Sequence, residues 1–171
     1  MSDIKQEKVI KIHPISVSIE GTKTILFQMN YCIHKVYLNN NKIGLGFFCK
    51  IPINNRNKKF LPVIITSNNA LNDSKNIKII KLINNNKIKE IKIDNSRKKY
   101  INPDNNIAII EIKPNKDKIY NYLELDENYI YKSRENIEKE YKNKSIYIIH
   151  YQKEKINVSY SLINDILDSK K

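Results

Sequence analysis

Short runs of hydrophobic residues, separated by clusters of Asn and Lys, recur along most of this 171-residue chain. Several runs alternate Ile with Lys or Glu, as in KIKEIKI at residues 87–93, which is typical of a β-strand with one face in water. The pattern predicts six strands before residue 113, at residues 24–38, 43–51, 61–66, 76–83, 87–93 and 106–112. We therefore expect a mostly β protein built from short antiparallel strands.

Asparagine clusters mark the turns between two pairs of these strands. Asn tolerates the positive φ of tight turns, so the clusters predict hairpin turns at residues 39–42 and 84–86. A first turn centred on residues 40 and 41 would place Cys32 directly opposite Cys49, about 4.5 to 5.5 Å apart at Cα. The two thiols would then be neighbours in the sheet.

Two of the three glycines in the chain, Gly44 and Gly46, lie two positions apart on one predicted strand. Phe47 and Phe48 follow them directly. A glycine inside a strand often marks a place where another part of the protein approaches the backbone closely. This stretch is the only part of the sequence where spacing indicates a site and not only a surface.

The GLGFF strand and the next strand, which ends in Thr66, Ser67, Asn68 and Asn69, resemble the trypsin-like serine peptidases. In that family a G-x-G-F-F strand precedes an apolar strand ending T-x-x-H, and the His is the catalytic base. The fourth position here is Asn69, whose amide cannot accept the proton of a nucleophile. The catalytic Asp of the family precedes the sixth strand in a D-I-A-x-I pattern, and the matching residue in NIAII is Asn106.

The resemblance implies a fold class: mostly β, with a six-stranded antiparallel trypsin-like barrel, a connector helix and the first hairpin of an incomplete second barrel. It implies an N-terminal extension at residues 1–23 and the first barrel at residues 24–113. A connector with a short helix would follow at residues 114–144, and the second barrel would start within residues 145–171. Closing six strands into a barrel also removes exposed sheet edges.

For activity, the resemblance implies a pseudopeptidase or a fragment that ends before the nucleophile segment, acting as a binding or structural module. Asn69 and Asn106 replace the base and the residue that orients it. Asp104 does not substitute, because Pro103 fixes it in the entering loop and no His is left for it to orient. No glycine follows Gly46, so neither a G-x-S-G motif nor an oxyanion loop can form from these residues.

Two alternatives remain open. In the first, the chain is the N-terminal half of a serine endopeptidase that another chain completes by supplying the Ser, although both amide replacements count against it. In the second, it is a basic β protein that binds nucleic acid or an acidic protein, because its net charge is +13 and its pI is about 9.6. Nucleic acid is not favoured, since bidentate phosphate and base recognition uses Arg. Among 31 basic residues the arginines are Arg56, Arg97 and Arg134.

The sequence predicts neither a cofactor nor a metal site, because no His, Cys or carboxylate groups recur at metal-ligand spacing. His34 lies within a strand instead of after the third strand, so we interpret it as a structural residue. No apolar run approaches about 18 residues and no signal-peptide core is present, so we expect no membrane partner and a cytoplasmic location. Both cysteines should then stay reduced.

The C-terminal part predicts a surface for a partner. Residues 133–142 should form a short helix with Ser133 as N-cap, followed by strands at residues 146–150 and 158–163. A lone hairpin is marginally stable in water, so we expect this one to fold back on the barrel and the helix. An open edge at residues 145–163 would then pair with a protein partner or with a second copy of the chain.

Overall fold

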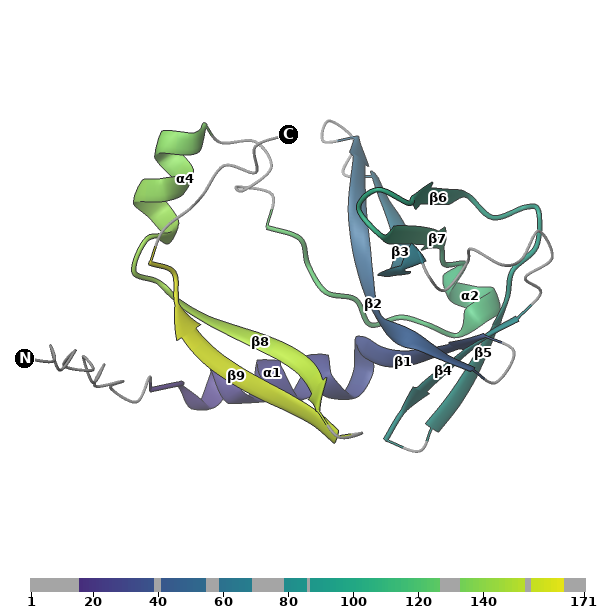
Figure 1. Ribbon diagram of the computed structural model, residues 1–171, viewed down its shortest axis with the longest axis horizontal. Coiled ribbons are helices and arrows are strands. Elements are labelled where there is room, and N and C mark those ends of the chain that lie inside the picture. The colour runs from purple at the N-terminus through teal and green to yellow at the C-terminus, as the bar shows by residue number, and fades with distance from the viewer. Residues whose placement is uncertain are drawn as a thin grey trace, which may run out of the picture.

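The computed structural model describes residues 16–38, 41–54, 59–68, 79–85, 87–126, 133–152 and 155–164 (Figure 1). The expectation of a mostly β protein is confirmed, since most of these residues lie in strands. The large sheet has seven strands: β1 (Ile33–Leu38), β2 (Asn41–Asn54), β3 (Lys59–Ser67), β4 (Ile79–Asn84), β5 (Lys87–Lys92), β6 (Lys99–Asn102) and β7 (Ile107–Glu111). A separate hairpin consists of β8 (Ser145–Gln152) and β9 (Lys155–Leu162). The helices among the described residues are α1 (Ile19–Tyr31), α2 (Pro114–Asp117) and α4 (Arg134–Tyr141).

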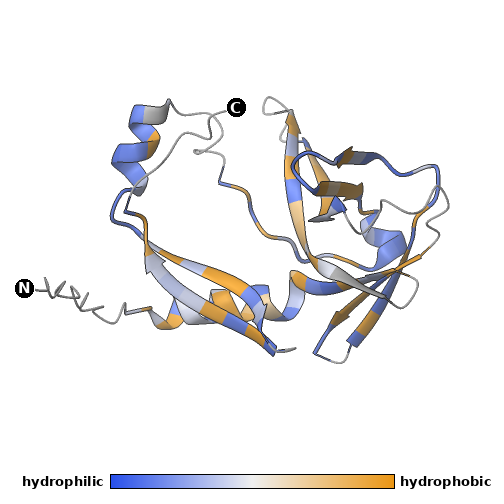
Figure 2. Cartoon of the chain, in the orientation of Figure 1, coloured by the Kyte–Doolittle hydropathy of each residue, from blue (hydrophilic) through white to orange (hydrophobic). Residues whose placement is uncertain are grey.

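The large sheet curls so that both of its ends contribute to one hydrophobic core. Its strands lie in the order β5-β4-β1-β2-β3-β7-β6, and every neighbouring pair is antiparallel. A flat sheet would keep β5 far from β7, yet side chains of both strands belong to the same buried cluster. That cluster consists of Val36, Phe48, Ile64, Ile80, Leu82, Ile91, Ile93, Ala108, Ile110, Ile112 and Ile119. Figure 2 shows hydrophobic residues along the strands of the large sheet, whereas α4 is mostly hydrophilic.

Arg97 holds the two ends of the curled sheet together. It lies in residues 93–98, which join the edge strands β5 and β6, and its side chain is fully buried. Its Nε donates to the carbonyl of Lys92 at the end of β5, at 2.8 Å, and one Nη donates to the carbonyl of Glu111 on β7, at 3.0 Å. Both Nη atoms donate to the Asp117 carboxylate on α2 at 2.7 Å. We call these contacts the Arg97 network.

The first predicted strand is wrong over residues 24–31, which belong to α1. Ser18 caps this helix by accepting a hydrogen bond from the Gly21 N–H at 3.0 Å. Ile25 is the buried residue of the helix. At the other end, the Asn84 amide donates to the carbonyls of Met29 and Ile33, at 2.6 and 2.7 Å. Helix α1 begins at Ile19, so the expected limit of the N-terminal extension at residue 23 falls inside it.

The expected pairing of Cys32 with Cys49 is also wrong. Cys32 is the C-cap of α1, and its carbonyl accepts from the N–H of Phe48, so the register differs by one residue from the predicted one. Ile33 lies opposite Phe47, and a second shift occurs between Val36 and Tyr37. Both thiols are buried, and burial raises the pKa of each to about 11, which keeps them protonated at neutral pH.

Other local predictions are confirmed. A Cβ on Gly46 would lie 2.7 Å from a methyl of Val36 and 2.9 Å from one of Ile64, so glycine leaves room for these side chains of β1 and β3 to pack over β2. The second Asn cluster forms a tight turn in which Asn84 faces Lys87 and Asn85 has φ 47°. Helix α4 follows Ser133 as N-cap, although that side chain makes no capping hydrogen bond. Strand β6 was not predicted at all.

We expect Arg97→Met to lower the free energy of unfolding by about 3–5 kcal/mol, because it leaves the Asp117 carboxylate buried without its cation. Urea denaturation at pH 7 measures the loss. Lys116→Met is the matched control, since it removes an ion pair with Asp94 of the same 2.7 Å length between side chains that are 51% and 30% exposed. Equal losses in the two variants would show that the Arg97 network does not hold the sheet.

Candidate functional site

The end of β3 and the turn before β7 lie together in the structure. Thr66 Oγ1 donates to the carbonyl of Leu45 at 2.8 Å, and the Asn68 N–H donates to the carbonyl of Asn106 at 3.0 Å. Asn106 has φ 50°, which Asn adopts more easily than most residues. Asn69, the other candidate site residue, lies outside the described residues.

This place lacks the features of a charged catalytic group. Asn106 carries a neutral amide and is exposed in the turn. Asp104 is also exposed in this turn. Within the described residues, the two chain segments are joined by the Asn68 N–H, which donates to the Asn106 carbonyl.

The inner face of the curled sheet becomes polar at the end formed by β1, β4 and β5. Side chains two positions apart on a strand share a face. His34 is therefore on the same face as the core residue Val36, and Asn84 on the same face as Leu82. Lys89 likewise shares the face of Ile91, and Lys87 faces Asn84 across the hairpin.

These inward positions surround a cavity of about 240 Å³, which we call the lysine cavity. Lys89 Nζ donates to the carbonyl of Lys118 at 3.0 Å, which fixes the Lys89 ammonium at the cavity. The amide of Asn84 is held by two carbonyls near the end of α1. The lining residues are Asn30, Tyr31, His34, Asn84, Lys87, Lys89, Lys118, Ile119, Tyr120 and Asn121.

His34 forms a buried wall of the lysine cavity. Its side chain packs against Phe48 with ring centroids 5.0 Å apart, and the residue is 6% exposed. Burial, and then the charge of Lys89, lower the pKa of His34 to about 4, so the ring is neutral at pH 7. Its Nδ1 has no hydrogen-bond partner among the described residues. His34 therefore packs in the core, as expected for a structural residue, and also lines the cavity.

The lysine cavity was missed because KIKEIKI was interpreted as a strand with one wet face. Ile88 and Ile91 are three positions apart, so a regular strand cannot turn both toward the core. The structure buries Ile91 and leaves Ile88 63% exposed. That spacing is the sequence signal that places Lys87 and Lys89 on the same side of β5 as Ile91, where both lysines remain exposed at the cavity.

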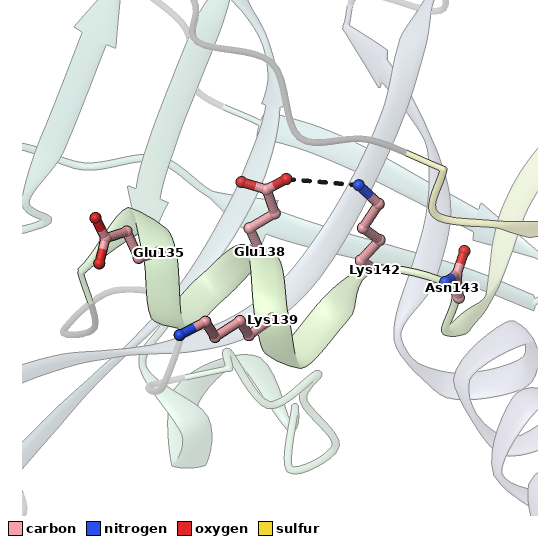
Figure 3. A pocket seen from close by; sticks show the side chains of 5 residues that line it. All are labelled: Glu135, Glu138, Lys139, Lys142 and Asn143. Carbon is pink, nitrogen blue, oxygen red and sulfur yellow. Dashed lines mark ion pairs between the residues drawn. The ribbon is translucent and has the colours of Figure 1, made fainter.

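Two other hollows have less specific linings. One of about 480 Å³ lies along α4, where Glu138 and Lys142 form an exposed ion pair at 3.7 Å (Figure 3). Of its remaining lining residues, Glu135 is negatively charged, Lys139 is positively charged and Asn143 is neutral. Another of about 350 Å³ lies between the large sheet and the hairpin, where Lys35 Nζ is 5.0 Å from the ring centre of Tyr151. Neither hollow gathers one kind of chemistry.

No known family model, curated protein or solved structure matches this chain. Among the described residues, no three His, Cys, Asp or Glu side chains gather in a way that would hold a metal ion. None of the described helices has the length and apolar character needed to cross a bilayer.

Stability should fall between pH 7.5 and pH 5 because of His34. The unfolded state takes up a proton below pH 6.5, whereas the folded state resists protonation until about pH 4, so acid favours unfolding. We expect a loss of about 2 kcal/mol in the free energy of unfolding over this interval. Urea denaturation of His34→Gln should show a free energy of unfolding that depends less on pH than that of the wild type. His150→Gln, which removes a His from the hairpin, is the control. An unchanged slope in His34→Gln would contradict the assignment.

Proposed function

We propose that this chain is a non-catalytic relative of the trypsin-like peptidases and that it acts by binding. The observation that carries the proposal is the single core shared by β4, β5 and β7, which supports closure of the sheet into one barrel. In this proposal β5 and β6 act as one bent strand, because they follow each other along the chain and stand at opposite edges of the sheet. Six strands then close the barrel.

Loss of catalysis follows from the residues at the two triad positions. Asn106 lies beside the end of β3 but offers an amide, and Asn69 replaces the His. A second chain that supplied a nucleophilic Ser would find no base to activate it and no acid to orient a base. This chemistry disfavours the half-peptidase alternative.

The purified chain should not react with a fluorophosphonate probe. Without a base and without glycine-flanked backbone donors, its serines keep the low reactivity of free hydroxyl groups. Gel fluorescence and mass spectrometry measure labelling, with trypsin as the positive control and Asn106→Asp as a variant that restores one carboxylate. Stoichiometric labelling of a single Ser in the folded chain would overturn the proposal.

The β8–β9 hairpin is the surface that we propose for a protein strand, from a second copy or from a partner. Among the described strands, β8 and β9 pair only with each other, so each strand has one edge that pairs with no other described strand. The hairpin lies along α1, with the Tyr147 hydroxyl donating to Gln28 at 2.8 Å (Figure 1). It nevertheless exposes Ile148, Tyr160 and Leu162 by about half. Exposed edges with apolar side chains support strand addition.

Sedimentation at micromolar concentration should give a mass above that of the 20.2 kDa monomer and rising with concentration. Ile148→Lys should lower this mass, because it places a charge in the proposed interface. Ile88→Lys is the matched control on an exposed Ile of β5. A monodisperse monomer whose residues 145–163 resist proteolysis would show that the hairpin needs no partner, whereas rapid cleavage there in a monomer would indicate a missing partner protein.

A further inference from the structure

Three lysines and no described carboxylate line the lysine cavity. The acidic residue of β5 is Glu90, which strand alternation puts on the outer face. There, a Glu90 carboxylate oxygen lies 3.9 Å from Lys81 Nζ. Lys87, Lys89 and Lys118 form no ion pair with any carboxylate of the described part of the chain. The positive charge of the cavity is therefore not neutralised by these residues.

The buried wall of the cavity also carries unused hydrogen-bonding capacity. His34 Nδ1 lacks a partner among the described residues, and so does the Oδ1 atom of Asn84, which is 4% exposed. Such atoms are uncommon in folded proteins, and a bound ligand or water is a usual reason for them. A neutral imidazole can donate or accept at its free nitrogen, so it adapts to an oxyanion or to a ligand hydroxyl.

We propose that the lysine cavity binds a small molecule that carries a phosphate group. Three ammonium groups match a phosphate dianion better than a single carboxylate, and Lys is a common phosphate ligand. Asn30 and Asn121 add amide donors at the same cavity. This binding site is independent of the hairpin and of the peptidase resemblance, so it extends the proposed function.

The size of the cavity limits the ligand. Its volume of about 240 Å³ is below the roughly 300–1,000 Å³ of sites for drug-sized molecules, which favours a phosphate group with a small body. Tyr31 and Tyr120 line the cavity and are 48% and 63% exposed, so their rings are available to an aromatic or apolar body. Binding of a nucleic-acid duplex would instead use an extended basic surface.

Calorimetric titration at 150 mM salt tests the proposal with two probes, inorganic phosphate and phenyl phosphate. We expect saturable binding of one molecule per chain, and tighter binding of phenyl phosphate because the rings of Tyr31 and Tyr120 are available to its phenyl group. Lys89→Gln should weaken binding about tenfold, the loss typical of one charge-assisted hydrogen bond. Lys99→Gln, on the exposed strand β6, is the matched control and should change affinity less than twofold.

Lys118→Asn is a second variant, because Lys118 has φ 54° and Asn accepts that backbone conformation. It should also weaken binding while leaving the thermal midpoint close to that of the wild type. The proposal is overturned if neither probe saturates, if Lys99→Gln weakens binding as much as Lys89→Gln, or if a duplex RNA binds and inorganic phosphate does not compete. None of these outcomes alters the hairpin result, so the two proposals fail separately.

Discussion

The buried ion pair of Arg97 and Asp117 is the interaction on which the rest of the structure depends. Arg97 donates to carbonyls at the ends of β5 and β7, strands from opposite halves of the sheet, while Asp117 brings α2 against them. The Asp117 carboxylate also accepts from the Lys113 N–H at 2.8 Å. Hydrogen bonding to Asp117 raises the pKa of Arg97 above its usual value, so the guanidinium stays charged. Because Arg97 links β5 to β7, the sheet curls and its apolar face is enclosed in one core.

Enclosure gives the molecule two chemically different inner regions. Most inward positions are apolar and form the core, but His34, Asn84 and Lys89 continue the same face into a polar cavity. Residues 118–121, which follow α2, complete that cavity. The Arg97 network therefore supports the proposed ligand site indirectly, because Asp117 precedes this segment directly. The turn at Asn106 lies at the end of β3 and plays no part in the cavity.

The strands and the turn that depend on local patterns can be predicted from the sequence. Alternating Ile residues located most strands, and the Asn cluster at Asn84 located a turn whose geometry Asn tolerates. Local patterns do not predict what depends on distant contacts. The β-branched and aromatic residues of α1 favour a strand locally. The helix is fixed instead by Asn84, which lies more than fifty residues away and donates to carbonyls at its end. The inward side of Lys89 could be found only by noticing that Ile88 and Ile91 cannot both face the core.

Methyl NOE spectroscopy of the folded chain tests the central claim, the sharing of one core by both ends of the sheet. The account predicts cross-peaks that link the inward methyl groups of Leu82 and Ile91, on β4 and β5, with those of Ala108 and Ile110 on β7. Cross-peaks confined to each half of the sheet, with none between the halves, would contradict the curled sheet and the cavity that depends on it.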